Sequence, residues 1–342
     1  MRHFEFWPPR LFELPYYVGL LAGCALRGLQ PKDLARANYA LDHGEIGIGS
    51  KAETQFQFPQ ERFLPTEHLP DDETYGQRRA RGLAFAAATG YPLVLKPDRG
   101  SVGKGIVRID GPAELDARLK QITGPYLLQQ FTTLPVEHGV FYTRYWGQPR
   151  ITGVNRKHFP RVTGDGTTAL GELASRHERF THHWHAFLQY HDLQRVPAAG
   201  ETVQLSFIGS HTLGCKFTDD SAGLTPELAA AVFALFETQP GFNFGRIDVK
   251  SASVDAFWRG EFTVIEVNGV ASLPTHMFDP RHSLARGYGI FFEHARHLLR
   301  AATEQRHQSM SLASYREIIA AVGRSAGTLE ANHSRLMGEA TE

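Results

Sequence analysis

The chain lacks an excess of either charge and has few cysteines. Among its 342 residues, Lys and Arg total 36, and Asp and Glu also total 36. Because this balance gives no basic footprint for nucleic acid, we expect no nucleic-acid partner. Cys24 and Cys215 are the only cysteines, which argues against a disulfide framework and fits a reducing compartment. We therefore expect a cytoplasmic protein.

Long hydrophobic runs are also missing. The most apolar stretch, Leu14 to Leu26, includes Pro15 and is too short for a membrane span, which needs about 20 residues. We interpret it as a buried helix, and no segment near it resembles a signal peptide. The alternative is a membrane-surface contact through the aromatic side chains of this region. These are Trp7, Phe12, Tyr16 and Tyr17.

The most informative segment that is present is YPLVLKPDRGSVGKGI, residues 91–106. An apolar strand leads to Lys96, a proline ends its hydrogen bonding, and glycines at 100, 103 and 105 precede a second strand. Glycines let the backbone approach a ligand and turn its N–H groups inward, and lysines add positive charge. The segment predicts a polyphosphate-binding loop; the alternative is a glycine-rich hairpin with a solvated lysine.

The order of residues in this loop excludes three known nucleotide loops. A P-loop needs a lysine directly after its last glycine, whereas Gly105 is followed by Ile106. A dinucleotide fingerprint has G-x-G-x-x-G between a strand and a helix, whereas G-x-x-G-x-G stands here between two strands. In protein kinases the glycine loop precedes the lysine, and here the lysine comes first.

The pattern of apolar residues and helix-breaking residues predicts a mixed chain of the α+β class. Around the loop we expect a helix over 73–89, strands over 92–96 and 105–109, a helix from Pro112 and a strand over 126–130. Later we expect strands over 138–145, 149–156, 201–208, 243–250 and 261–268, with helices near 168–180, from Pro226 and near 283–305. The expected divisions are a short N-terminal region 1–65, a small subdomain 66–135, a larger domain 136–305 and a helical or partly disordered tail 306–342.

A second group of polar residues lies in the segment 244–269. Period-two alternation places Arg246, Asp248 and Lys250 on one face of the first strand, and Glu266 and Asn268 on one face of the second. If the strands form a hairpin, Asp248 lies opposite Glu266, and Arg246 lies opposite Asn268. Two carboxylates and an amide oxygen suit Mg²⁺; the alternative is an ion-paired polar face on a half-exposed sheet.

Both groups, in this order, resemble the ATP-grasp carboxylate–amine ligases, the superfamily of D-alanine–D-alanine ligase, glutathione synthetase and cyanophycin synthetase. The motifs LKPDRGSVGKG and RIDVK…VIEVNG carry the resemblance, which covers roughly residues 38–280. It implies an ATP-grasp fold, in which ATP lies between a small lid subdomain and a larger mixed-sheet domain. It also implies ATP and two Mg²⁺ ions as cofactors, with Mn²⁺ as an alternative, and a small-molecule carboxylate and amine as substrates.

The resemblance implies nucleotide-binding roles for eight residues. Lys96 would contact the α- and β-phosphates, while Ser101 and Gly103 would cover the β- and γ-phosphates. Gln130 and Phe131 would lie beside the adenine. The remaining candidates for binding ATP are Lys51, Lys104 and Glu137, the last at the ribose.

It also implies the metal and catalytic residues. Asp248, Glu266 and Asn268 match the metal ligands, and Arg246 could reach the transferring phosphoryl group together with Lys96. Further candidates for holding a substrate carboxylate or the intermediate are Arg144, Arg150, Lys157 and His276.

Two departures limit the transfer of a substrate. The region before the small subdomain is shorter than the usual N-terminal domain, and GVASLPTHMFDP after Asn268 differs from the dipeptide ligases. A histidine-rich run invites a zinc hypothesis, but no cysteine or acid completes a familiar ligand set, so we interpret it as a solvated helix. The run comprises His177, His182, His183, His185 and His191.

The expected function is an ATP-dependent ligase that joins a carboxylate to an amine through an acyl phosphate and releases ADP and phosphate. Two alternatives stay open: an ATP-grasp kinase that phosphorylates a small-molecule hydroxyl, and a nucleotide-binding protein without turnover. A homodimer is also compatible with the sequence.

Overall fold

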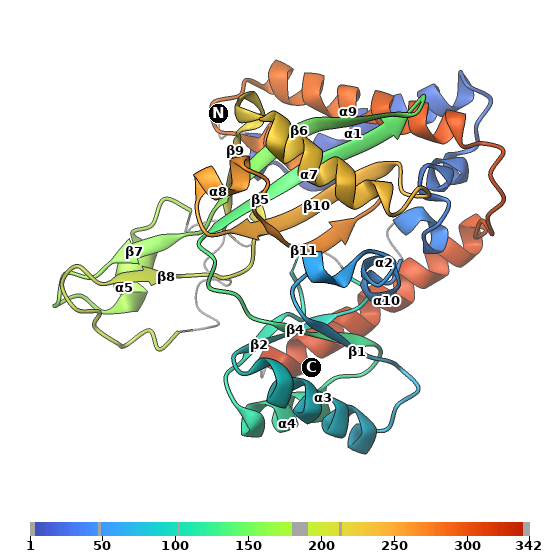
Figure 1. Cartoon of the computed structure of the whole chain (residues 1–342). Coiled ribbons are helices and arrows are strands. Elements are labelled where there is room, and N and C mark those ends of the chain that lie inside the picture. Colours follow the sequence, from blue (N-terminus) through green and yellow to red (C-terminus); the bar gives the residue numbers. More distant parts are fainter. Residues whose placement is uncertain (1–3, 47–48, 101–102, 180–190, 212–213, 338–342) are drawn as a thin grey trace.

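Two antiparallel sheets and a short two-stranded ribbon carry the fold (Figure 1). The computed structural model describes residues 4–46, 49–100, 103–179, 191–211 and 214–337. The strand order is β1-β4-β2-β3 in the smaller sheet and β11-β10-β5-β6-β9 in the larger one. The α+β class predicted from the sequence is confirmed. Ser101 and three histidines of the predicted run, His182, His183 and His185, lie outside the described residues.

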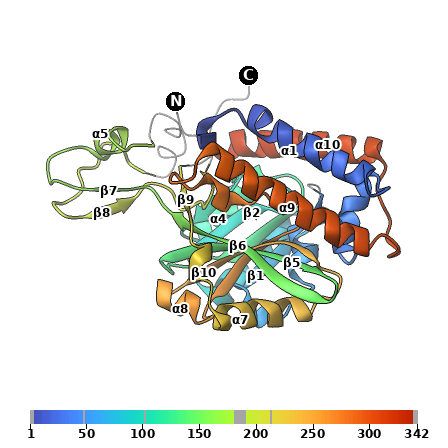
Figure 2. The same ribbon diagram turned by 90° about the horizontal axis from the view of Figure 1, so that it is seen from above.

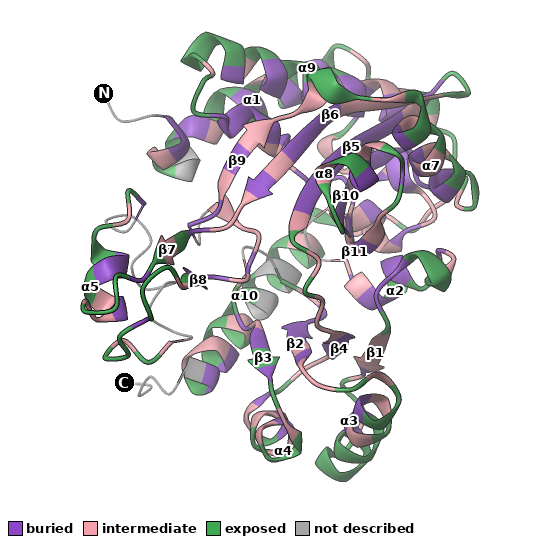
Figure 3. Ribbon diagram, turned by 60° about the vertical axis from the view of Figure 1, so that its left-hand side comes forward, coloured by how far each residue is buried: buried purple, intermediate pink, exposed green. Residues whose placement is uncertain are grey.

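The smaller sheet and two helices form the lid, residues 66–130, in the predicted β-α-β-β-α-β order. Its elements are β1 (Thr66–Leu69), α3 (Tyr75–Thr89), β2 (Leu93–Pro97), β3 (Val107–Ile109), α4 (Pro112–Gln121) and β4 (Tyr126–Gln130). Thr74 caps α3 by accepting a hydrogen bond from the Gln77 amide, and Gly90 ends it with a φ of +79°. Both helices bury one side on the sheet. Their opposite sides are exposed to solvent, as the green residues of α3 and α4 in Figure 3 show.

The larger sheet forms the body of the molecule. Its strands are β5 (Val136–Tyr145), β6 (Gln148–His158), β9 (Lys216–Asp219), β10 (Phe244–Ser251) and β11 (Thr263–Asn268). The hairpin register predicted for the last two is confirmed, with Asp248 opposite Glu266 and Arg246 opposite Asn268. One face of the sheet packs on the amphipathic helix α7 (Pro226–Glu237) and on α8 (Val254–Trp258). The other face is shared: polar side chains of β10 and β11 occupy part of it, and Phe141 and Phe244 pack there against His294 of α9 (Leu284–Glu304).

Two predicted elements are shorter than expected. The helix near 168–180 is α5 (Leu170–Ser175), and the strand over 201–208 is β8 (Thr202–Gln204), which pairs with β7 (Arg161–Thr163). These three elements form the arm that projects to the left in Figure 1. Among the described residues, their apolar cluster comprises four buried residues, Leu170, Ala174, Val203 and Leu205.

The apolar N-terminal stretch forms α1 (Pro9–Ala25), which packs on α9 (Leu284–Glu304) over the body (Figure 2). Phe12 and Tyr16 are buried and stack on Phe291 of α9. The opposite side of α1 exposes Leu14 and Leu21. Within the described residues, no helix is both long and apolar enough to cross a membrane.

Shorter elements connect these units. They are η1 (Phe4–Phe6), η2 (Pro31–Asn38), η3 (Asp42–Glu45), α2 (Lys51–Gln55), η4 (Gln60–Arg62), η6 (Ser221–Gly223) and η7 (Thr275–Phe278). The predicted tail contains one long helix, α10 (Tyr315–Met337), which follows α9 and packs on the lid. Its Leu336 belongs to the hydrophobic core of the lid.

Candidate functional site

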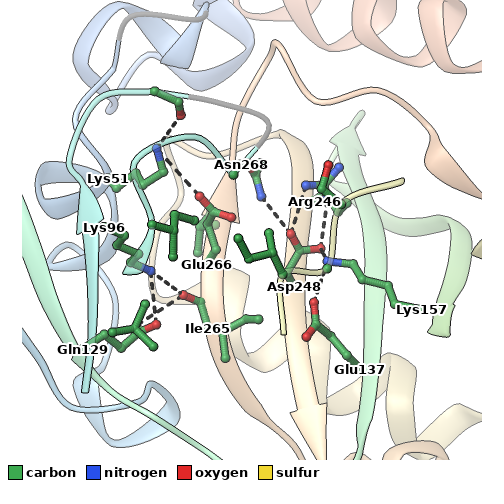
Figure 4. Close-up of a pocket in the computed structure, with 18 of the residues that line it drawn as sticks. Lys51, Lys96, Gln129, Glu137, Lys157, Arg246, Asp248, Ile265, Glu266 and Asn268 are labelled. Atoms are coloured by element: carbon green, nitrogen blue, oxygen red, sulfur yellow. Dashed lines mark hydrogen bonds and ion pairs between the residues drawn. The ribbon is translucent and has the colours of Figure 1, made fainter. Parts of the chain in front are cut away.

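A cavity of about 510 Å³ lies between the lid and the body. Lys96 and Gln129 line it from the lid sheet, Lys51 from α2, and the polar face of β10 and β11 from the body (Figure 4). The sequence-predicted residues that line this cavity are Lys51, Lys96, Gly103, Lys104, Gln130, Phe131, Glu137, Lys157, Arg246, Asp248, Glu266 and Asn268. Residues far apart in the chain, from Lys51 to Asn268, therefore meet at one place.

The body wall of the cavity is a charged row across the larger sheet. Glu137 on β5 pairs in register with Lys157 on β6 and with Lys250 on β10. Its carboxylate is 2.7 Å from the Lys157 Nζ and 3.4 Å from the Lys250 Nζ. Glu137 is only 2% exposed, so both lysines are needed to balance its buried charge.

The next row holds the most connected carboxylate, Asp248. Arg246 donates to it through Nε and Nη2, each at 2.9 Å, and the Lys157 Nζ lies 3.2 Å from its Oδ1. Burial raises the pKa of Asp248, but the charges of Arg246 and Lys157 outweigh this effect and lower the pKa overall. Asp248 is therefore ionised at neutral pH. Burial lowers the pKa of Lys157, but the charges of Asp248 and Glu137 outweigh this effect and raise the pKa overall.

Glu266 and Asn268 on β11 complete this group. The Asn268 Nδ2 donates to the Asp248 Oδ2 at 3.3 Å, and the Glu266 Oε1 lies 3.9 Å from the Lys51 Nζ. Among the described residues, no group of three or more His, Cys, Asp or Glu side chains could hold a metal ion. The donor set here is instead two carboxylates and one amide, all hard oxygen donors that fit Mg²⁺ with water and phosphate completing its coordination.

Lys96 dominates the lid wall. Its Nζ donates at 3.2 Å to both the Gln129 Oε1 and the Ile265 carbonyl of the body. A register shift between Asp248 and Val249 leaves Ile265 without a partner in the β10–β11 register, so its carbonyl can accept from the lid. Burial lowers the pKa of Lys96 to about 8, partly offset by Glu266. Within the described part of the chain, both hydrogen-bond partners of this buried lysine are neutral.

A carboxylate that the sequence analysis missed, Glu45, also lines the cavity. It accepts from the Thr54 hydroxyl at 2.8 Å and from the Gly269 amide at 2.5 Å, and its φ is +55°. Burial raises its pKa to about 7. A positive φ at a non-glycine residue is unusual and often marks a functional position. In the sequence, Glu45 stands in the glycine-rich segment 44–49. This segment could have drawn attention to it, but it is not part of the two motifs that carry the family resemblance.

The glycine loop runs along the lid edge of the cavity. Gly103 and Gly105 have φ values of +79° and +71°, in the left-handed region that favours glycine. Lys51 ties the loop to α2, since its Nζ donates to the Gly100 carbonyl at 2.6 Å. The segment expected beside the adenine, residues 130 and 131, comes at the end of β4. There the Arg108 guanidinium lies over the Phe131 ring, 4.9 Å from its centroid. The Gln130 side chain donates to the Thr89 carbonyl.

The structure does not bring three predicted substrate residues to this cavity. Arg144 lies at the far end of β5 and donates to the Asn243 side chain and to three carbonyls of residues 239–242. Arg150 binds the carbonyls of the β5–β6 turn and covers the Tyr145 ring at 4.0 Å. His276 is buried over Gly153, and burial lowers its pKa to about 4. Strand alternation alone did not show how far along each strand the cavity extends.

No protein-family model and no curated protein matches this chain. Solved structures do match. A bifunctional glutathione synthetase from Pasteurella multocida is similar over 71% of this chain and 36% of its own length, with 14% identity and a TM-score of 0.36. A carboxyaminoimidazole ribonucleotide synthase from Aspergillus clavatus, solved with ATP, is similar over 65% of this chain and 44% of its own, with 11% identity and a TM-score of 0.38.

A D-alanine–D-alanine ligase from Bacillus anthracis is similar over 77% of this chain and 70% of its own, with 13% identity and a TM-score of 0.43. The chain thus spans less than half of the first two proteins. What the chain does is argued below from its own side chains.

Proposed function

We propose that this protein is an ATP-dependent ligase that joins a carboxylate to an amine through an acyl phosphate. The observation that carries the proposal is the cavity between lid and body. It has Lys96 on the lid, Lys51 on α2, and Arg246, Asp248 and Glu266 on the body. Cations facing a pair of carboxylates suit a metal-bound polyphosphate, because each charge on the ligand then meets its opposite.

The nucleotide would lie with its base at the end of β4 and its phosphates between the two walls. Phe131 would cover the base, Gln130 would lie beside it, and Glu137 would accept from the ribose hydroxyls. Lys96 would bind the α- and β-phosphates in place of its present neutral partners. Gly103 and Lys104 would cover the β- and γ-phosphates, and Ser101 is proposed with them on the motif alone.

Asp248, Glu266 and Asn268 would hold Mg²⁺ through their oxygens. A bound Mg²⁺ would neutralise charge on the phosphates and orient them for in-line transfer. Asp248 is already paired with Arg246 and Lys157. These cations would therefore loosen from Asp248 on binding and become available to the γ-phosphoryl group and to a substrate carboxylate.

The proposed chemistry has two steps. A substrate carboxylate oxygen attacks the γ-phosphorus, the bond to the β-phosphate oxygen breaks, and ADP leaves. The amine nitrogen then attacks the acyl carbon, phosphate leaves with the C–O bond electrons, and the nitrogen loses a proton. Arg246 would stabilise the charge that develops in both steps, while the closed lid excludes water from the acyl phosphate.

The test is ADP and phosphate release with Mg²⁺, measured across a panel of carboxylates crossed with amines. Hydroxylamine serves as a general amine, because it converts an acyl phosphate to a hydroxamate that can be detected directly. We expect ADP release that needs both a carboxylate and an amine, with an equal amount of amide or hydroxamate. Asp248→Asn should lower it by about 10²–10³-fold, and Asp255→Asn, which changes an exposed carboxylate on α8, is the matched control.

The same assay separates the alternatives. A stable phosphoester formed without an amine would identify a kinase. Nucleotide binding without ADP release for any pair in the panel would identify a non-catalytic nucleotide-binding protein. Unchanged ADP release by Asp248→Asn would contradict the proposed site.

A further inference from the structure

The C-terminal helix α10 lies against the glycine loop, although it is outside the region that carries the family resemblance. The Glu330 carboxylate is 2.5 Å from the Lys104 Nζ, and the Gly105 amide donates to the His333 Nδ1 at 3.3 Å. Leu329 approaches the same loop, with its methyl groups 3.2 Å and 3.3 Å from where side chains at Gly100 and Gly105 would begin. One turn of α10 therefore contacts both ends of the described loop.

Two other residues anchor α10 to the lid independently of this contact. Asn332 donates to the Thr123 carbonyl at 2.7 Å and accepts from the Thr123 amide at 3.1 Å. Leu336 is 2% exposed within the lid core, and Arg118 donates to its carbonyl at 2.6 Å. The anchors fix the position of the helix, so Glu330 stays near Lys104 without depending on the strength of their ion pair.

The opposite end of this segment lies on the body. The Gln308 carbonyl, between α9 and α10, accepts from Arg36 of η2 at 2.5 Å. The segment that joins α9 to α10 therefore contacts the body, and α10 continues to the lid (Figure 1). The helix α10 therefore places Glu330 beside Lys104 of the glycine loop.

We propose that Glu330 is an intramolecular competitor of the nucleotide phosphates for Lys104, so that α10 sets the nucleotide affinity. This inference rests on the proposed function, because it assigns Lys104 to the β- and γ-phosphates. A carboxylate and a phosphate are both anionic acceptors, and the ammonium must leave Glu330 to move onto the ligand. The pair is partly solvated, with side-chain exposures of 43% and 60%, so the competition is moderate in size.

The experiment measures equilibrium binding of a fluorescent, non-hydrolysable ATP analogue by the full chain and by Glu330→Gln. Glutamine keeps the size of the side chain and removes its charge. We expect about two- to fivefold tighter binding by the variant, the range for releasing one exposed ion pair. The gain should shrink as salt is raised, because salt screens the competing pair, and it should be absent for an AMP analogue, which lacks the β- and γ-phosphates.

Two further variants isolate the pair. Glu317→Gln removes a carboxylate from the same helix that hydrogen-bonds to the Ser314 amide instead, and it should bind like the wild type. In a Lys104→Gln background, Glu330→Gln should have no effect, because the double-mutant cycle then contains no competing pair. Thermal unfolding of the wild type and of the four variants checks that the lid remains folded.

The outcomes are distinct. Equal affinities for wild type and Glu330→Gln, or weaker binding by Glu330→Gln with unchanged unfolding, would overturn the inference while leaving the proposed function in place. A gain that persists in the Lys104→Gln background would also overturn it. If neither protein binds the ATP analogue, both the inference and the proposed function fall.

Discussion

The two walls of the cavity are built in different ways. On the body wall, Glu137, Asp248 and Arg246 project from paired strands, and their partners lie 2.7 to 3.4 Å away. On the lid wall, the hydrogen-bond partners of Lys96 among the described residues are an amide and a carbonyl, and the glycine loop depends on left-handed backbone angles. The body wall is therefore preorganised by charge pairing, while Lys96 holds neutral partners that it can exchange for a ligand.

The largest effect is expected on the body wall, for Asp248→Asn. We expect turnover to fall by about 10²–10³-fold, the scale for losing one preorganised contact. Stability should fall as well, by up to about 3–5 kcal/mol, because Arg246 and Lys157 lose the buried charge that balances them. Kinetics and urea unfolding measure the two effects. Normal turnover, or normal stability, would show that the pairing is not what organises this wall.

Lys96→Met tests the lid wall and should separate catalysis from stability. Turnover should again fall by about 10²–10³-fold. The folded pKa of Lys96 is lowered from 10.5 to about 8, so between these values the unfolded chain binds a proton that the folded protein has released. The free energy of unfolding should therefore rise with pH across this window in the wild type, by about 1–3 kcal/mol, and Lys96→Met should lack that rise.

Urea unfolding of both proteins from pH 7 to pH 10.5 provides the measurement. Parallel curves for the wild type and the variant would contradict the low pKa. They would also place Lys96 with the charge-paired residues of the body.

Gly105→Ala tests whether the glycine loop needs its unusual backbone. The φ of Gly105 is +71°, and an added Cβ would lie 3.0 Å from the Pro97 Cγ. We expect a loss of about 1–2 kcal/mol, the cost of this conformation for a residue with a side chain, together with weaker nucleotide binding. Gly111→Ala is the control, because its φ is −170° and nothing lies within 4 Å of an added Cβ. Equal thermal stability of the two variants would refute the prediction.

The smallest effect on catalysis is expected for Arg144→Gln. Its guanidinium holds the segment 239–243 through hydrogen bonds and does not reach the cavity. We expect stability to fall by about 1–2 kcal/mol, because buried acceptors lose their donor, while kcat and KM of the folded enzyme stay unchanged. A selective loss of kcat would restore the catalytic role that the sequence suggested.

Local sequence rules predicted much of the body wall. Alternation along two strands placed Arg246, Asp248 and Lys250 on one face, and only one register kept Ile247 and Val249 in the core. Helix-ending and helix-starting residues did the same for the lid: Gly90 ends α3, and Pro112 begins α4. These signals succeed because they act between residues close in the chain.

The errors have a shared physical origin. Arg144 lies an odd number of residues after Glu137 on β5, so it projects from the other face of the strand, and it binds another loop. Glu45 reaches the site from a short irregular segment without any period to reveal it. Both depend on contacts between distant parts of the chain, which local patterns do not encode.

The sequence by itself determined the α+β elements, the hairpin register and the residue types that gather around a polyphosphate, because strand alternation, helix caps and glycine spacing are local properties. Only the tertiary structure decided that Lys96 hydrogen-bonds to the Ile265 carbonyl, that Glu45 enters the cavity and that α10 brings Glu330 to Lys104. These contacts join segments far apart in the chain, and they form only when the packing of the lid, the body and the C-terminal helix brings those segments together.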